Sequence, residues 1–142
     1  MKLQDLDFRV WSKLENGYIE YPALAKLGSV LPAKVHRANR AIPFIEFDER
    51  DDEKEVEFWT GLRDLNNAKI YEGDIVSFEA DSHDMGTLTI VGVVSFENGR
   101  FIIEGHENMF PHYSFYNFIS RYKDIRIIGN IHINTELLGD EK

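Results

Sequence analysis

The stretch TLTIVGVVSFENGRFII, residues 87–103, decides the fold. Residues 87–96 are rich in β-branched side chains, which favour an extended strand. Asn98-Gly99 follows, a pair typical of a two-residue hairpin turn because both residues tolerate a positive φ. The chain then returns through residues 100–103. The sequence therefore predicts a β-hairpin in this region.

Shorter strand patterns lie on both sides of this hairpin. Apolar and polar residues alternate over residues 6–10, and Asn16-Gly17 marks a turn into a second strand. Residues 22–40 lack such alternation and support at most one short helix. Many short strands with scarce helix predict a mainly β protein with a minor α+β contribution, built as a small barrel or coiled sheet. Further strand patterns occupy residues 43–48, 55–59, 70–78 and 125–133.

Charge and composition exclude several classes of protein. The chain has 16 Lys and Arg against 25 Asp and Glu, so its net charge of -9 disfavours non-specific attraction to nucleic acid. It contains no cysteine, which excludes disulfides and thiolate metal sites. Asp5, Asp7 and Arg9 stand where the apolar core of a signal peptide would lie, and no apolar run is long enough to span a membrane. We expect a soluble, cytoplasmic protein.

The charges are unevenly distributed along the chain. Residues 46–57 hold eight acidic residues against Arg50 and Lys54, and we expect this acidic segment to form a solvated loop or strand edge. Lys34, Arg37 and Arg40 make a compact basic patch. Opposite charges on one chain can steer self-association, although the patch could also bind a nucleic-acid backbone or ion-pair locally.

Two segments near the middle of the chain read Thr60-Gly61-Leu62-Arg63-Asp64 and Ile70-Tyr71-Glu72-Gly73-Asp74-Ile75-Val76. Together they resemble the signature of the YopX family of phage and prophage proteins, which places this protein in the bacterial host cell. Residues 8–11 are similar to the amino-terminal strand of that family, and residues 128–131 with 136–138 to its carboxy-terminal ending. Asn67 stands where the family usually has glycine, a change that a left-handed turn permits.

The resemblance implies a fold and no catalytic residues. Family members are similar to a β protein whose carboxy-terminal part forms an SH3-like barrel, so we divide the chain into a β-rich region with the acidic segment, residues 1–59, and an SH3-like barrel region, residues 60–142. Gly73 would supply a tight bend, and Asp74 would accept hydrogen bonds from nearby amides. We interpret the motif as structural, and it comprises Thr60, Gly61, Leu62, Tyr71, Gly73 and Asp74.

Enzymatic motifs are absent from the sequence. It has no phosphate-binding loop, no dinucleotide fingerprint and no nucleophile elbow. The segment beginning at His106 starts like a zinc-protease helix, but Phe110 replaces the second histidine. Asp81, His83 and Asp84 could bind a cation if folding added a ligand such as His106 or His112, which leaves a metal-dependent hydrolase as a remote alternative. We otherwise expect no enzyme and no cofactor.

Aromatic residues concentrate late in the chain and favour an interface. Rings such as these bury much area at low rotamer cost, so an oligomer interface or a core is the expected use. The hypothesis is therefore a phage-derived, non-enzymatic module that forms a homo-oligomer and binds a host or phage protein, with no membrane partner. Nucleic-acid binding through the basic patch is the alternative. The four rings assigned to the contact surface are Phe110, Tyr113, Phe115 and Tyr116.

Overall fold

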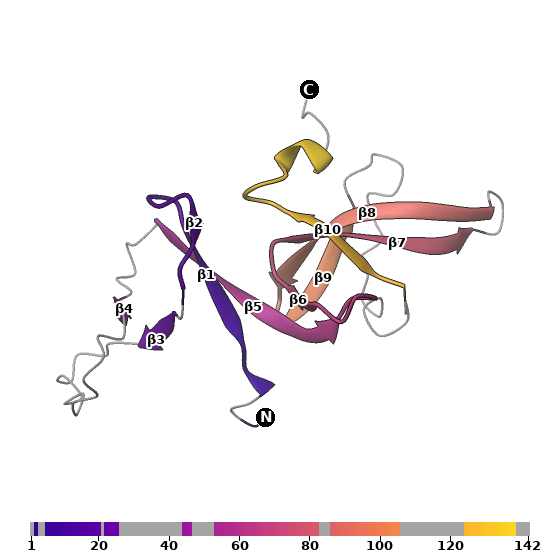
Figure 1. Cartoon of the computed structure of the whole chain (residues 1–142). Coiled ribbons are helices and arrows are strands. Elements are labelled where there is room, and N and C mark those ends of the chain that lie inside the picture. Colours follow the sequence, from indigo (N-terminus) through magenta and orange to yellow (C-terminus); the bar gives the residue numbers. More distant parts are fainter. Residues whose placement is uncertain are drawn as a thin grey trace. The chain divides into compact units, whose positions relative to one another are not determined.

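The computed structural model describes residues 2, 5–20, 22–25, 44–46, 53–82, 86–105 and 124–138 (Figure 1). Within these residues the chain is mainly β and its antiparallel sheet is curled, which confirms the predicted fold class. Chain contacts divide it into a small unit, Phe8–Glu57, and a large unit, Met1–Asp7 with Phe58–Lys142. No helix of the described part is long and apolar enough to cross a membrane.

The small unit contains two pairs of short strands and the start of a fifth strand. β1 (Phe8–Ser12) pairs antiparallel with β2 (Gly17–Tyr18), as the alternation predicted. β3 (Ala23–Ala25) and β4 (Phe44–Glu46) pair in parallel. Residues 23–25, which lack strand-like alternation in the sequence, are thus held extended by pairing with a distant strand. Residues 26–40, the rest of the segment that could support one short helix, lie outside the described residues.

The large unit is built on the sheet order β10-β7-β8-β9. The predicted hairpin is confirmed, with Glu97 opposite Arg100 and positive φ angles of 51° at Asn98 and 78° at Gly99. Both central residues thus have the left-handed backbone that matches the twist of the flanking strands. The strands of this sheet are β7 (Asp74–Ser82), β8 (Gly86–Glu97), β9 (Arg100–Gly105) and β10 (Arg126–Asn130).

One face of this sheet carries the hydrophobic core. Its buried members come from the sheet, from the loop before β10 and from β6 (Lys69–Tyr71). Gly92 lies against this layer, since a Cβ there would be 2.6 Å from both the Glu104 carbonyl oxygen and Ile103 Cγ2. The backbone of β9 therefore approaches β8 at a point where no side chain fits. The buried core residues are Ile70, Val76, Phe78, Val94, Ile103 and Ile125.

The carboxy-terminal strand is shorter than the sequence predicted. β10 ends at Asn130, whose side-chain oxygen accepts a hydrogen bond from the His132 amide at 2.9 Å. The chain then turns into a 3₁₀ helix, η2 (Thr135–Leu138). His132 is therefore part of a turn, although the strand pattern over residues 125–133 predicted it to be in a strand. The local asparagine hydrogen bond competes successfully with strand pairing.

Candidate functional site

The two segments of the sequence signature lie side by side in the large unit. β5 (Lys54–Arg63) begins in the small unit, and its second part pairs with β6, with Trp59 opposite Tyr71 and Arg63 opposite Lys69. The Thr60 hydroxyl donates to the Ile70 carbonyl at 2.8 Å and accepts from the Leu62 amide at 3.2 Å. Gly61 has a φ of 87°, at the shift in register between the strands.

Asp64 closes the turn between β5 and β6. Its Oδ1 accepts hydrogen bonds from the amides of Asn66, at 2.8 Å, and Ala68, at 2.9 Å. Its Oδ2 accepts from the Ile127 amide at 3.3 Å, which ties the turn to β10. Burial acts to raise the pKa of this carboxyl, but the hydrogen bonds outweigh it and hold the pKa below its ordinary value. Asn67 takes the left-handed backbone, with a φ of 66°.

Gly73 and Asp74 form the bend that leads into β7. Gly73 has a φ of 79°, and its amide donates to the Val94 carbonyl at 2.8 Å. Asp74 is almost fully buried, and its Oδ2 accepts from the Tyr71 amide at 2.8 Å. Ile75 and Val76, which follow, are also fully buried. These contacts account physically for the second signature segment.

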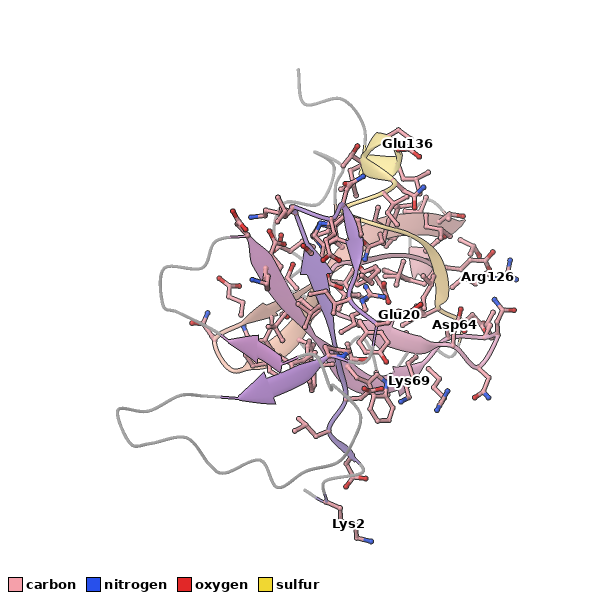
Figure 2. The ribbon with its side chains drawn as sticks, turned by 60° about the vertical axis from the view of Figure 1, so that its left-hand side comes forward. Lys2, Glu20, Asp64, Lys69, Arg126 and Glu136 are labelled. Atoms are coloured by element: carbon pink, nitrogen blue, oxygen red, sulfur yellow. The ribbon has the colours of Figure 1, made fainter. Side chains whose placement is uncertain are left out.

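A surface of rings and cations lies beside the signature and is the candidate functional site. Asp7 Oδ2 forms an ion pair with Lys69 Nζ and accepts a 2.7 Å hydrogen bond from the Tyr71 hydroxyl. Lys69 Nζ is 4.8 Å from the centre of the Trp59 ring, and Arg63 Cζ is 5.9 Å from it. We call these five residues the ring-cation surface; Figure 2 labels Lys69 within it.

The hydrogen bonds of the ring-cation surface fix its rings in place. The Trp59 indole donates to the Leu62 carbonyl at 2.8 Å, so the ring is held by the same strand that carries it. Arg63 donates to the Asn67 carbonyl at 2.7 Å. With the Asp7 carboxylate already accepting two donors, this arrangement suits binding through ring faces and cations better than proton transfer.

Sequence reasoning missed three members of this surface. Asp7 and Trp59 lie outside the quoted signature, and Lys69 lies in the turn region between its segments. The available signal was positional: Trp59 immediately precedes the first segment, and a strand pairing would place it opposite Tyr71. The contribution of Asp7 had no local signal, because it joins the site from a distant part of the chain.

A second cluster with similar chemistry lies in the small unit. Glu57 Oε2 accepts hydrogen bonds from Arg9 Nε at 2.5 Å and from the Tyr18 hydroxyl at 3.0 Å. Arg9 Cζ is 4.7 Å from the Tyr18 ring centre, and Trp11 meets Tyr18 edge-on at 5.1 Å. Glu57 is buried, so this end of the acidic segment is not the solvated edge that the sequence indicated. Its charge is compensated locally by Arg9.

Most residues of the remaining predicted sites lie outside the described residues. This applies to the basic patch of Lys34, Arg37 and Arg40 and to the four interface rings, Phe110, Tyr113, Phe115 and Tyr116. Asp81 lies in β7, whereas His83, Asp84, His106 and His112 are not described. Among the described side chains no group of three or more His, Asp or Glu residues could hold a metal ion. The metal hypothesis stays a prediction.

Comparison with known proteins identifies the family. A family model described as YopX protein matches residues 7–139. The chain belongs to the YopX family. The fold resembles the crystal structure of protein EF1440 from Enterococcus faecalis, with a TM-score of 0.53 and 22% identity over 94% of this chain and 97% of that one. That likeness concerns the fold alone. No curated protein matches the chain.

Proposed function

We propose that this YopX-family chain is a non-enzymatic protein-interaction module of phage origin that assembles with copies of itself. The observation that carries the proposal is the ring-cation surface of the large unit. Tryptophan, tyrosine and arginine dominate the energetics of protein interfaces. Here all three residue types are gathered around one half-buried indole, Trp59.

The rigidity of this surface supports the proposal. Binding costs free energy when side chains lose rotamer freedom, so rings held in advance bind at lower cost. Tyr71 is anchored through Asp7, and Trp59 is anchored through the Leu62 carbonyl. The surface is therefore arranged before any partner arrives.

The sequence supports self-association independently. The basic patch and the acidic segment carry opposite charges on one chain, and electrostatic complementarity raises association rates and fixes orientation. A host or phage protein would be the further partner of the assembled form. The chain's aromatic-rich segment, residues 110–122, would enlarge the contact area.

Light scattering coupled to size-exclusion chromatography tests the proposal. We expect the full chain to form oligomers at micromolar concentration, and Trp59→Ala together with Arg63→Ala to shift it toward monomer. Phe96→Ala is the matched control, because Phe96 is an exposed ring at the β8–β9 turn, outside the ring-cation surface. A wild-type chain that stays monomeric would refute self-association.

Nucleic-acid binding is the second candidate, and the cations around Trp59 favour it. A base can stack on the accessible part of a half-buried indole such as Trp59 while Arg and Lys contact the phosphates, and each stacked base contributes about 1–3 kcal/mol. Fluorescence anisotropy with single-stranded and duplex oligonucleotides at low salt tests this function. Binding that weakens in Trp59→Ala and falls steeply with salt would support it, and no binding at low salt would exclude it.

A further inference from the structure

The tripeptide Glu-Asn-Gly occurs twice in the chain, at residues 15–17 and 97–99. Both asparagines are exposed and lie in hairpin turns with nearly the same left-handed φ, which is 50° at Asn16 and 51° at Asn98. The two sites are thus matched in their immediate sequence and in this backbone angle. The hairpins differ in where they place the glycine that follows the asparagine.

Gly17 belongs to a strand ladder. It lies in β2 opposite Ser12 of β1. Two residues along the same ladder, the Ile19 amide donates to the Val10 carbonyl at 2.9 Å. Hydrogen-bonded pairs alternate with non-bonded pairs in an antiparallel ladder, so the Ser12–Gly17 pair is again of the bonded kind. Strand pairing therefore holds the Gly17 backbone, including its amide nitrogen, in place.

Gly99 lies in the turn of its hairpin and not in the ladder. Glu97 and Arg100 are the last pair between β8 and β9, and Asn98 and Gly99 form the two-residue turn between them. A Cβ built on Gly99 would meet no atom of the described residues within 4 Å. Glycine also has no side chain to obstruct an approach to its own nitrogen. The amide nitrogen of Gly99 is therefore less restrained than that of the paired glycine in β2.

We propose that Asn98 is a site of spontaneous deamidation in the folded protein. The Gly99 nitrogen forms a bond to the side-chain carbonyl carbon of Asn98. The bond from that carbon to the side-chain nitrogen breaks, and ammonia leaves with the proton from Gly99. Water then opens the cyclic imide at either carbonyl, giving aspartate or isoaspartate, in which the main chain runs through the side-chain carbon. The reaction consumes water alone and is independent of the proposed function.

Isoaspartate at position 98 would disturb the hairpin more than the new charge alone. It inserts an extra carbon into the main chain, at a turn whose two residues match the twist of the flanking strands. Those strands supply Val94 and Ile103 to the buried core, and the ring centres of Phe96 and Phe101 lie 5.0 Å apart across them. Deamidation therefore loosens the hairpin on which the large unit is built.

Timed incubation of the full chain at mildly alkaline pH, followed by peptide mapping with mass spectrometry, tests the site. In the folded protein we expect Asn98 to deamidate about fivefold faster than Asn16, because releasing Gly17 first costs about one net hydrogen bond. In concentrated urea the two rates should converge, since the tripeptides are identical. The proposal is contradicted by no deamidation at Asn98, by equal rates in the folded protein, or by a difference that persists in urea.

Two glycine variants give the matched comparison. Asn98→Gly removes the reacting amide and keeps a residue that adopts a positive φ, and Asn16→Gly makes the same change in the other hairpin. We expect Asn98→Gly to abolish most of the isoaspartate that an isoaspartyl methyltransferase assay detects, and Asn16→Gly to leave most of it. Comparable losses in the two variants would refute the assignment.

Thermal melts measure the effect on the hairpin. After incubation the wild type should melt at a lower temperature than fresh protein, whereas Asn98→Gly should melt as it did before incubation. Asn98→Asp introduces the charge without the extra carbon, and it should melt closer to fresh wild type than the isoaspartate form does. Unchanged melting of a wild type that carries isoaspartate at position 98 would refute the loosening of the hairpin.

Discussion

The two units contain the same chemical cluster in different surroundings. In each, one carboxylate oxygen accepts both a cation and a tyrosine hydroxyl, and a tryptophan lies beside them. In the small unit the Glu57 side chain is 4% exposed. In the large unit the Asp7 side chain is 34% exposed. Burial, and not the choice of residue types, is what separates the two clusters.

This difference assigns them different roles. A buried ion pair is costly to break, because removing one partner leaves an uncompensated charge in a low dielectric. A half-exposed pair contributes little to stability, since water and salt screen it. The Glu57 cluster therefore maintains the small unit, whereas the ring-cation surface keeps its side chains within reach of a partner.

The largest effect should follow from Glu57→Gln. We expect a loss of about 3 kcal/mol in the free energy of unfolding, because Arg9 loses its counter-charge in a buried site. Urea denaturation followed by tryptophan fluorescence measures this loss in a Trp59→Phe background, because Trp11 is then the only tryptophan and reports on the small unit. Glu55→Gln is the control: Glu55 pairs with Lys13 at an exposed site, and its loss should be small. Equal losses of stability in Glu57→Gln and Glu55→Gln would mean that burial does not make the Glu57 ion pair more important than an exposed one.

Asp64→Asn should have the next largest effect, about 2 kcal/mol, because charge-assisted hydrogen bonds are lost. The folded-state pKa of Asp64 lies below its unfolded value, so its contribution is present above about pH 4 and lost as the pH falls through the folded value. Urea titrations between about pH 2 and pH 7 should show wild type and variant converging in acid. A difference independent of pH would contradict this assignment.

The corresponding tyrosines of the two clusters, Tyr18 and Tyr71, give a further test of the effect of burial. Tyr18→Phe should cost about 1.5 kcal/mol, because buried Glu57 loses a hydrogen bond that water cannot replace. Tyr71→Phe should cost only about 0.5 kcal/mol, since water can reach Asp7. The two single variants, compared in the same denaturation experiment, share one chemical change. A larger cost for Tyr71→Phe would reverse the interpretation.

Asp7→Asn should have a similarly small effect on stability, about 0.5 kcal/mol, because the ion pair with Lys69 is half-exposed. Added salt should diminish the difference between variant and wild type. Thermal melts at low and high ionic strength measure this. If Asp7→Asn lost as much stability as Glu57→Gln, Asp7 would be a structural residue. The proposal that the ring-cation surface is a binding site would then be contradicted.

Local signals predicted much of the fold. Asn98-Gly99 predicted the hairpin because both residues adopt a positive φ, and alternation located β1 and the first half of β5. The Gly73-Asp74 bend was also readable, because its hydrogen bond joins residues three apart. Each of these features depends on neighbours in the sequence.

Features that depend on distant residues were not predicted. The parallel pairing of β3 with β4 joins segments that read as unrelated, and the early end of β10 follows from an asparagine contact within a turn. For the candidate site, the signature pointed to Tyr71 but not to Asp7 or Lys69, whose relevance comes only from their meeting. The burial of Glu57 was missed because an acidic run reads as solvated.

The bond between Asp64 and the Ile127 amide has a consequence for synthesis of the protein. The signature turn emerges from the ribosome long before β10, yet its carboxylate and the Leu65 amide both bond to that late segment. The Gly73 carbonyl likewise accepts a hydrogen bond from the Ile131 amide, which is synthesised later. The large unit therefore stays incomplete until residues 125–131 have left the ribosome and can pair with the earlier strands.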